Sequence, residues 1–190
     1  MHKNFRKNRK TVRQILNHHF DRFGKCDRIK MLASHLKMPT LFFEKKDEEK
    51  TMIPERLAAL REKMRAYGVD AYLVPTADYH ESEYVGTYFK ARTYITGFTG
   101  SAGTAVITQD EACLWTDGRY FVQAAKELAG TGVTLMKMGQ EGVPTVEEYL
   151  AANTKEGMTI GFDGRVVNEM LGEALEKTLP ERFLSYRSDL

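Results

Sequence analysis

Hydrophobic and polar positions change their spacing repeatedly along the chain, and each change predicts a new element of secondary structure. From residue 51 onward, apolar residues three or four positions apart indicate helices, and short apolar runs beside turn residues indicate strands. Helices are predicted from residue 51 or 53 to 67 and over 119–128, 146–151 and 168–179, and strands over 71–74, 94–96, 103–108, 112–115, 133–136, 158–162 and 183–186. This alternation predicts an α/β fold: a mixed, mostly parallel sheet with one antiparallel hairpin and helices on both faces.

Charge divides the chain into two parts. Residues 1–50 contain 14 Lys or Arg and 6 Asp or Glu, whereas residues 51–190 contain 14 and 20. We therefore predict a basic N-terminal extension over 1–50, helical in part or disordered, and a folded domain over 51–190, with the charged run Lys45–Lys50 as a hinge. Apolar spacing over residues 12–23 predicts a short amphipathic helix. Such an extension fits an accessory tail, a transit peptide, or a segment that contacts nucleic acid or a membrane surface.

The overall composition is that of an ordinary globular protein. Hydrophobic residues make up 42% and charged residues 28% of the chain, and no apolar run approaches the ~20 residues of a membrane helix. The two cysteines, Cys26 and Cys113, form no paired disulfide or metal motif, and the apolar run around Cys113 predicts a buried free thiol. We predict a cytoplasmic protein whose folded domain binds neither nucleic acid nor a membrane.

Three polar and glycine-rich segments interrupt the hydrophobic pattern within 44 residues: Asp78–Tyr84, Gly97–Thr104 and Trp115–Phe121. Polar connections that follow strands are typical of sites carried by a rigid scaffold. The glycine spacing matches neither the dinucleotide-binding fingerprint nor a phosphate-binding loop, and Ser101 lacks the nucleophile-elbow pattern. The segments therefore predict a site without indicating its chemistry.

Asp78 and His80 are the first candidate site residues. Asp78 is predicted to cap a helix N-terminus, with Ser82 and Glu83 in the first turns of that helix. The His80 imidazole can form hydrogen bonds to a substrate or a neighbouring domain near neutral pH. The spacing of these residues and Glu81 matches no metal-binding motif, so we expect no metal here.

Arg92 and Phe98 are two further candidates, each with two interpretations. Arg92 fits either an exposed ion pair or an anchor for a carboxylate or peptide carbonyl, because its guanidinium is a planar fork of donors. Phe98 fits either the core or the apolar wall of a pocket. The segment Gly97–Gly103 fits a tight turn with positive φ and close backbone contact, or a loop beside a ligand cleft. Asp117 and Arg119 bracket a glycine and predict a turn that starts a helix.

Several motifs in one order make the chain resemble the Xaa-Pro aminopeptidase (aminopeptidase P) family, in its long three-domain form. The resemblance extends from about Ile53 to Leu190 and leaves residues 1–50 outside. Its motifs are Val74-Pro75, Asp78-x-His80-x-Ser82-Glu83-Tyr84, Gly97-Phe98-x-Gly100-Ser101-Ala102-Gly103-Thr104, Trp115-Thr116-Asp117-Gly118-Arg119-Tyr120-Phe121, Thr134-Leu135-Met136-Lys137 and Gly142-Val143-Pro144-Thr145. The resemblance implies that residues 51–190 have the fold of a creatinase/prolidase N-terminal domain.

The resemblance also implies a role for this domain. Enzymes of that family release an N-terminal residue that precedes proline, and their C-terminal domain holds two divalent metals, typically manganese. This chain is then a non-catalytic N-terminal domain, inactive alone, with no catalytic residue, metal or cofactor of its own. The implied substrate-cleft residues are Asp78, His80, Arg92 and Phe98. The implied partners are proline-containing peptides, the protein's own C-terminal catalytic domain and a second copy in a homodimer.

Two other interpretations stay open. The chain fits a stand-alone binding or regulatory module of the same fold, and it fits the N-terminal domain of a prolidase or creatinase relative. The presence of both Gly97–Thr104 and Trp115–Phe121 favours the aminopeptidase.

Overall fold

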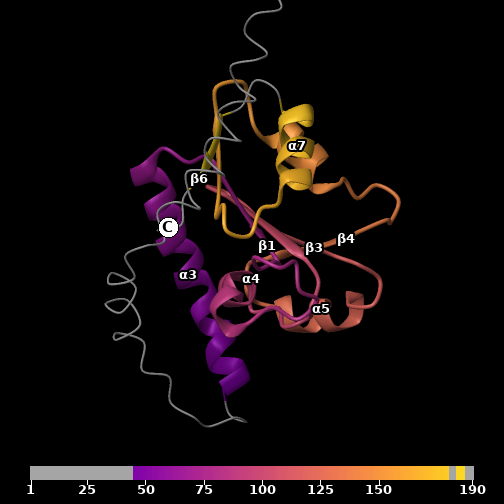
Figure 1. Cartoon of the computed structure of the whole chain (residues 1–190). Helices are drawn as coiled ribbons and strands as arrows, with labels where there is room; N and C mark the ends of the chain where they lie inside the picture. Colours follow the sequence, from indigo (N-terminus) through magenta and orange to yellow (C-terminus); the bar gives the residue numbers. More distant parts are fainter. Residues whose placement is uncertain (1–44, 180–182, 187–190) are drawn as a thin grey trace, which may run out of the picture. The chain divides into compact units, whose positions relative to one another are not determined.

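The computed structural model describes residues 45–179 and 183–186, and the side chains of residues 50–179 (Figure 1). These residues belong to one compact unit, Glu44–Leu190. Cys26 and the predicted amphipathic helix lie outside the described residues, and the division of the chain at residue 50 stays a prediction.

Helices and strands alternate along most of the described chain. The helices are α3 (Lys45–Tyr67), the short 3-10 helix η1 (Thr87–Phe89), α4 (Ala91–Thr96), α5 (Phe121–Leu128), α6 (Val146–Asn153) and α7 (Glu169–Thr178). The strands are β1 (Ala71–Pro75), β2 (Thr104–Thr108), β3 (Ala112–Thr116), β4 (Thr134–Lys137), β5 (Thr159–Phe162) and β6 (Phe183–Tyr186). Within these described residues, no helix is both long and apolar enough to cross a membrane.

The six strands form one mixed sheet in the order β4-β3-β2-β1-β5-β6. Strand β2 runs antiparallel to both of its neighbours, and the other three pairings are parallel. The predicted antiparallel hairpin is confirmed, because Val106 of β2 lies opposite Cys113 of β3. The mostly parallel sheet is confirmed as well, and β2 adds a second antiparallel pairing in which Val106 lies opposite Leu73 of β1.

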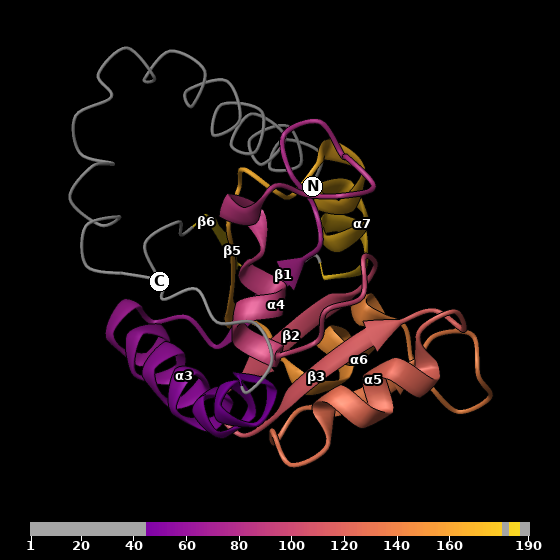
Figure 2. The ribbon, with the colours of Figure 1, turned by 90° about the horizontal axis from the view of Figure 1, so that it is seen from below.

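Each face of the sheet carries its own hydrophobic core, because successive side chains of a strand point to opposite faces. On one face α3, α4 and α5 pack on the sheet through residues that include Ile53, Leu57, Met64, Ile95, Ala124 and Leu128. On the other face α6 and α7 pack through Tyr149, Leu150 and Leu175. Figure 2 shows α5 and α6 on opposite sides of the strands. The predicted helices on both faces are therefore confirmed.

Helix α6 begins at Val146, as predicted, and hydrogen bonds between neighbouring residues define this start. The Thr145 hydroxyl accepts a hydrogen bond from the Glu148 backbone N–H at 3.2 Å, and the Glu148 carboxylate accepts one from the Thr145 N–H at 2.8 Å. This reciprocal capping box satisfies two N–H groups that the first turn of a helix leaves unpaired. Thr145 is therefore the N-cap of α6.

Cys113 is the buried free thiol that the sequence predicted. Its side chain lies in the core that α6 and α7 cover. Burial is the main cause that raises the pKa of this thiol. A protonated, buried cysteine packs like a small hydrophobic residue.

The segment Tyr94–Thr96 was predicted as a strand, and this prediction is wrong. It forms the end of α4, in which the Gly97 N–H donates to the Thr93 carbonyl at 2.8 Å and Gly97 ends the helix with a φ of 77°. Arg92, Ile95 and Thr96 are the buried residues of this helix. These residues are three and four positions apart, which is the spacing of a helix face. Because Arg92 is charged, the hydrophobic pattern of the sequence did not show this helical period.

Helix α3 starts earlier than the sequence predicted. Lys45–Lys50, predicted as a hinge, forms the first turns of α3, and Pro54 lies inside the helix rather than at its start. Proline is tolerated there only with the loss of one backbone hydrogen bond. The buried face of the helix continues on both sides of this position, through Ile53 and Leu57, and this packing stabilises the longer helix.

Candidate functional site

The three polar segments come together at one end of the sheet. Pro75, the last residue of β1, lies opposite Thr104, the first residue of β2, and Thr104 also lies opposite Trp115 near the end of β3. The segments that follow β1, precede β2 and follow β3 therefore meet at this edge. Ligand sites of α/β proteins lie beyond the carboxyl ends of strands, so this edge of the sheet is the candidate site.

Arg92 holds the glycine-rich segment 97–103, which we call the glycine loop, from inside the protein. Its guanidinium donates to the Phe98 carbonyl at 2.7 Å and to the Gly100 carbonyl, and its Nε donates to the Thr76 hydroxyl at 2.9 Å. The Thr76 hydroxyl in turn donates to the Gly103 carbonyl at 2.7 Å. One buried side chain thus connects both ends of the glycine loop to the end of β1.

The Arg92 side chain is only 3% exposed. Burial lowers the pKa of Arg92 to about 10, and the nearby charge of Glu127 partly offsets this shift. The guanidinium also lies over the Phe98 ring, 4.7 Å from its centroid. Between the two interpretations of Arg92, the exposed ion pair is wrong. Arg92 anchors peptide carbonyls, and these belong to its own chain.

Glu127 of α5 holds the glycine loop from the other side. Its carboxylate accepts hydrogen bonds from the Thr99 N–H and the Thr99 hydroxyl, both at 2.8 Å. The Gln123 amide adds a bond to the same hydroxyl at 2.9 Å. The loop therefore lies between a buried cation and a largely buried carboxylate, and its conformation is fixed on both sides.

Close packing inside the glycine loop leaves no space for a larger residue at Gly100. A Cβ atom there would lie 2.3 Å from Cζ of Phe98 and 2.8 Å from Cδ1 of Tyr120. The Phe98 and Tyr120 rings meet edge to face, with centroids 5.8 Å apart. Phe98 itself is fully buried. Close backbone contact, one of the two interpretations of this segment, is therefore present.

Asp78 organises the loop that follows β1. Its carboxylate accepts hydrogen bonds from the backbone N–H groups of His80 at 2.9 Å and Ser82 at 3.0 Å. These bonds lower the pKa of Asp78, with the Ser82 N–H as the largest cause. The predicted helix cap is wrong, because the next helical residues are those of η1, beginning at Thr87. Asp78 instead closes a turn in which Glu81 has a φ of 55°.

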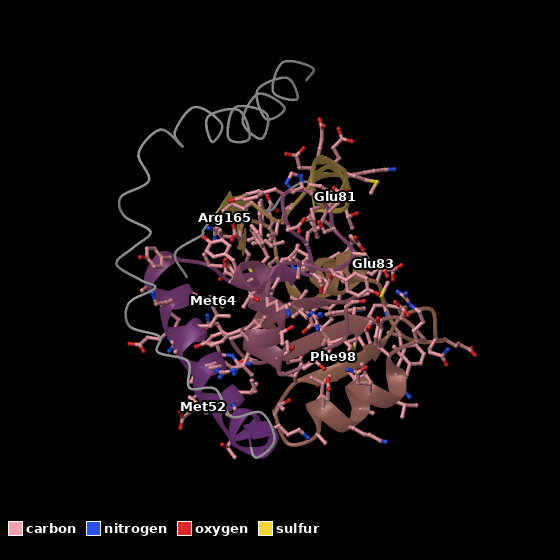
Figure 3. All side chains as sticks on the ribbon, turned by 60° about the horizontal axis from the view of Figure 1, so that its bottom comes forward. Met52, Met64, Glu81, Glu83, Phe98 and Arg165 are labelled. Atoms are coloured by element: carbon pink, nitrogen blue, oxygen red, sulfur yellow. The ribbon has the colours of Figure 1, made fainter. Side chains whose placement is uncertain are left out.

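Two contacts fix the Asp78 loop and the following helix η1 to the connection between β5 and α7. The Asn168 amide donates to the Glu81 carboxylate at 2.5 Å, and the Arg165 guanidinium donates to the Tyr88 hydroxyl. Figure 3 shows Glu81 and Glu83 at the periphery of the unit and Phe98 in its interior. His80 is exposed, so its imidazole is available to a ligand or another domain.

The turn after β3 adds a second polar group to this surface. Arg119 donates through Nε and one Nη to the two oxygens of Asp117, each at 2.9 Å. This pair lowers the pKa of Asp117 and raises the pKa of Arg119, the hydrogen bonds between the two side chains being the largest cause in each case. The charge of Glu83, in the segment that follows β1, also raises the pKa of Arg119.

The four candidate residues therefore form two pairs with different surroundings. Asp78 and His80 are neighbours on the outer surface, whereas Arg92 and Phe98 are in contact inside the protein. Thr76 connects the pairs, because it bonds to Arg92 and precedes Asp78 by two positions. We call Asp78, His80, Asp117 and Arg119 the polar rim. The rim presents carboxylates, an imidazole and a guanidinium at the end of the sheet where β1 and β3 end.

Sequence reasoning missed two residues that build this site. Glu127 lies in a helix without any motif that would single it out, and its contact with Thr99 joins segments 28 positions apart. Thr76 carried no motif at all. The glycine-rich composition of segment 97–103 was the only signal, because the backbone carbonyl and N–H groups of a loop need hydrogen-bond partners when they are buried.

The described residues do not fit a metal centre. Among them, no group of three or more His, Cys, Asp or Glu side chains could hold a metal ion. Asp78 and Asp117 direct their carboxylates to backbone N–H groups and to Arg119, respectively. The polar rim can bind and orient a ligand, and we derive no metal-dependent step from it.

Comparison with known proteins defines the class to which this fold belongs. Residues 56–187 match the family model of the creatinase/prolidase N-terminal domain. The chain therefore belongs to the creatinase/prolidase N-terminal domain family, and the expected fold is confirmed.

Particular relatives in this family are aminopeptidases. Aminopeptidase P2 of Arabidopsis thaliana is 40% identical over 140 residues, 73% of this chain and 20% of the relative. A probable Xaa-Pro aminopeptidase P of Talaromyces marneffei is 48% identical over 125 residues, 66% of this chain and 19% of the relative. The chain thus spans about a fifth of these relatives, and its resemblance to Xaa-Pro aminopeptidases is confirmed.

Solved structures agree with this assignment. The X-prolyl aminopeptidase of Caenorhabditis elegans, described as a cytosolic enzyme with a di-nuclear active site, has a TM-score of 0.66 and 35% identity, over 71% of this chain and 24% of that chain. The N-terminal domain of the cytoplasmic peptidase PepQ from Mycobacterium tuberculosis has a TM-score of 0.51 and 29% identity, over 71% of this chain and 94% of that chain. The second case is a domain of this kind solved as a separate chain.

Proposed function

We propose that this chain is the non-catalytic N-terminal domain of a metal-dependent Xaa-Pro aminopeptidase. In this proposal a C-terminal domain supplies the catalytic groups and binds two divalent metals, which we expect to be manganese. The N-terminal domain borders the active-site cleft with its polar rim. The complete enzyme releases an N-terminal residue that precedes proline and acts in the cytoplasm, alone or as a homodimer.

One observation carries the proposal. An exposed imidazole and a carboxylate, His80 and Asp78, lie on a loop whose Glu81 accepts a hydrogen bond from the β5–α7 connection. This loop is joined through Thr76 to a glycine loop that buried Arg92 anchors. Precise positioning of polar groups on a rigid support is what a substrate-binding surface requires. The similarity to Xaa-Pro aminopeptidases, of which this chain spans about a fifth, supports a shared site with a further domain.

Arg92 and Phe98 have a different part in this proposal. Both side chains are buried in the unit, and burial does not favour a direct contact with substrate. That contact stays a prediction. We propose that they act as positioning residues, which set the glycine loop and, through Thr76, the start of the Asp78 loop. Asp78 and His80 are the residues that we expect to contact a peptide.

The division of labour can be tested by comparing two proteins. We expect residues 1–190 to leave a peptide with proline at its second position intact in the presence of manganese, and a chain extended through the C-terminal domain to release its first residue. Cleavage by residues 1–190 alone would overturn the proposal. A reading frame that ends at Leu190 would favour a stand-alone binding module of the same fold.

The role of the polar rim needs a variant of the extended chain. We expect His80→Ala to lower kcat/KM about tenfold, since the loss of one positioning hydrogen bond has an effect of this order. Gln140→Ala is the matched control, because Gln140 is also an exposed turn residue and lies outside the rim. Equal activity of the two variants would show that the rim does not contact the substrate.

A further inference from the structure

The sequence Asp-Gly-Arg occurs twice in the chain, each time directly after a strand. Asp117–Arg119 follows β3, and Asp163–Arg165 follows β5. Each turn leads into a helix, α5 or α7, and then into a strand that pairs in parallel with the strand before the turn. The two turns therefore occupy the same place in two similar strand–helix–strand arrangements, and one turn can be compared with the other.

The aspartate of each turn holds the arginine in the same way. The backbone N–H and the Nε of Arg119 donate to Oδ1 of Asp117 at 3.0 and 2.9 Å. The same groups of Arg165 donate to Oδ1 of Asp163 at 3.0 and 2.8 Å. Nη2 donates to the second carboxylate oxygen, at 2.9 Å in the first turn and 2.5 Å in the second. Because the guanidinium is planar, this pairing orients its remaining nitrogen, Nη1, as well.

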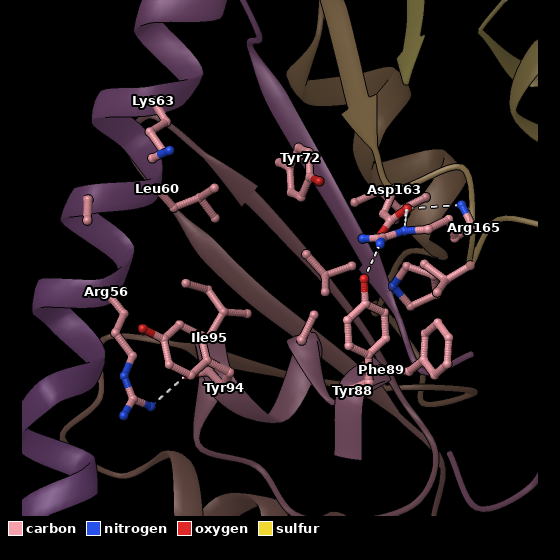
Figure 4. A pocket seen from close by; sticks show the side chains of 16 residues that line it. Arg56, Leu60, Lys63, Tyr72, Tyr88, Phe89, Tyr94, Ile95, Asp163 and Arg165 are labelled. Carbon is pink, nitrogen blue, oxygen red and sulfur yellow. Dashed lines mark hydrogen bonds and ion pairs between the residues drawn. The ribbon is translucent and has the colours of Figure 1, made fainter. Parts of the chain in front are cut away.

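The second turn shows what the remaining nitrogen binds there. Nη1 of Arg165 donates to the hydroxyl oxygen of Tyr88, and the guanidinium lies 5.4 Å from the centroid of the Tyr88 ring. Figure 4 shows the Arg165 guanidinium beside Asp163, with a dashed line to the Tyr88 hydroxyl. The acceptor is a neutral oxygen that a distant segment of the chain brings to the turn.

Among the described residues, the first turn has no such acceptor. Nη1 of Arg119 forms no hydrogen bond to this part of the chain, and the Arg119 side chain is 65% exposed, against 19% for Arg165. Its guanidinium also lies 5.3 Å from the centroid of the Tyr120 ring. An oriented donor that is open to solvent, at the end of the sheet where β1 and β3 end, can receive an acceptor from a ligand.

The charges around Arg119 favour a neutral acceptor. Asp117 already offsets the charge of the guanidinium, and the charge of Glu83 acts on Arg119 as well. A carboxylate that approached Nη1 would be repelled by both acids, whereas a peptide carbonyl carries no net charge. The Tyr88 hydroxyl in the second turn is likewise a neutral oxygen.

We propose that Arg119 binds a backbone carbonyl of the peptide substrate at the polar rim, and that Asp117 is the positioning residue of Arg119. This inference rests on the proposed function and adds a specificity to it, because the rim then recognises the peptide backbone and not a carboxylate. The carbonyl is not that of the scissile bond, so the hydrogen bond is equally strong before and during the reaction. Such a bond lowers KM and leaves kcat unchanged.

Variants of the extended chain test the two side chains, with the pentapeptide Ala-Pro-Gly-Gly-Ala as substrate. We expect Arg119→Gln to raise KM about tenfold and to leave kcat unchanged. Arg65→Gln is the matched control, because Arg65 is an exposed arginine of α3 that donates to the Gln109 side chain at 2.9 Å, and KM should stay as in the wild type. Asp117→Asn should raise KM about threefold, and should add nothing to Arg119→Gln, because Asp117 acts through Arg119.

Modified peptides identify the acceptor. The oxygen of each peptide carbonyl outside the scissile bond is replaced in turn by sulfur, which accepts hydrogen bonds more weakly. At one position the replacement should raise the KM of the wild type about fivefold and leave that of Arg119→Gln unchanged, as expected of two groups in contact. A C-terminal amide in place of the carboxylate should leave the effect of Arg119→Gln as it was.

The outcomes separate this inference from the proposed function. An extended chain that leaves the pentapeptide intact would overturn both. An active extended chain whose KM is insensitive to Arg119→Gln, or whose sulfur replacements act equally on both proteins, would overturn the inference alone. Loss of the Arg119→Gln effect with the amidated peptide would identify the C-terminal carboxylate as the acceptor. A lower urea midpoint of Arg119→Gln with unchanged KM would assign Arg119 to a contact with another domain instead.

Discussion

Arg92 directs its buried guanidinium to carbonyl oxygens of the glycine loop. This arrangement uses the planar fork of arginine, whose donors reach the Phe98 and Gly100 carbonyls and the Thr76 hydroxyl together. Removing a donor from a buried carbonyl leaves the carbonyl desolvated and unpaired. At the scale of single residues, the conformation of the glycine loop therefore depends on the hydrogen bonds that Arg92 donates more than on the apolar packing of its side chain.

We expect Arg92→Met to destabilise the protein by about 3 kcal/mol, because two buried carbonyls lose their donor. Arg61→Met is the matched control. Arg61 donates one hydrogen bond, to the Thr108 carbonyl at 2.9 Å, from a half-buried position, so a loss of about 1 kcal/mol is expected. Urea unfolding of both variants measures the difference. A similar loss for the two variants would contradict the anchoring role of Arg92.

The ion pair on the polar rim predicts a change in titration. Asp117 has a pKa below its ordinary value of 3.8, mainly through the hydrogen bonds from Arg119. A lowered pKa in the folded state stabilises the protein above pH 3.8, and this contribution is lost as the pH falls through the folded pKa. We expect Arg119→Gln to raise the pKa of Asp117 toward 3.8, as measured by NMR of the carboxyl carbon.

Asp78 is the internal control for that titration. Its pKa is lowered mainly by the backbone N–H of Ser82, which the Arg119→Gln variant retains. The signal of Asp78 should therefore titrate as before. A shift of Asp78 equal to that of Asp117 would show a general change in the rim rather than the loss of one ion pair.

At the scale of elements, helices and strands with a strong local signal were predictable. The capping box at Thr145 fixed the start of α6, and the turn at Gln109–Glu111 fixed the β2–β3 hairpin. Helix α4 was missed, because its buried face includes Arg92, whose partners lie in the Gly97–Gly103 segment and at Thr76. A buried charge is recognised from its partners, and the partners are known only once the chain is folded.

The candidate site follows the same rule. The three segments that form it interrupt the hydrophobic pattern and were found from the sequence alone. The conformations of these segments were not found from the sequence. Glu127 binds Thr99 across 28 positions, and Asp78 stabilises a turn instead of a helix. Carboxylates accept backbone hydrogen bonds in helix caps and in turns alike, so the sequence left these two outcomes unresolved.

The glycine loop gives a test at this scale. We expect Gly100→Ala to destabilise the protein by about 1–3 kcal/mol, because the added Cβ would overlap the Phe98 and Tyr120 rings. Gly172→Ala is the control. Gly172 lies inside α7 with nothing within 4 Å of an added Cβ, so its replacement should stabilise the helix by about 0.5–1 kcal/mol. Thermal unfolding separates the two, and opposite signs are the expected result.

At the scale of the whole molecule, the described residues form a unit with its own pair of hydrophobic cores. Both cores are built from residues between Ile53 and Leu179. The family match covers residues 56–187, and the N-terminal domain of the M. tuberculosis peptidase was solved as a separate chain. These observations agree that the stability of the unit arises from its own contacts.

We therefore expect residues 44–190 to fold without the basic extension and to unfold in one cooperative step. Its urea midpoint should equal that of the full chain, because it keeps every buried residue of both cores that the structure describes. A chain that begins at residue 58 is the control, since it lacks Ile53 and Leu57, which are 0% and 2% exposed. Loss of two such core side chains costs about 4–10 kcal/mol, which approaches the total stability of a domain of this size. The shorter chain should therefore be unfolded or aggregated.

Failure of residues 44–190 to unfold cooperatively would show that the extension is part of the folded structure, and the charge boundary would then not mark a domain boundary.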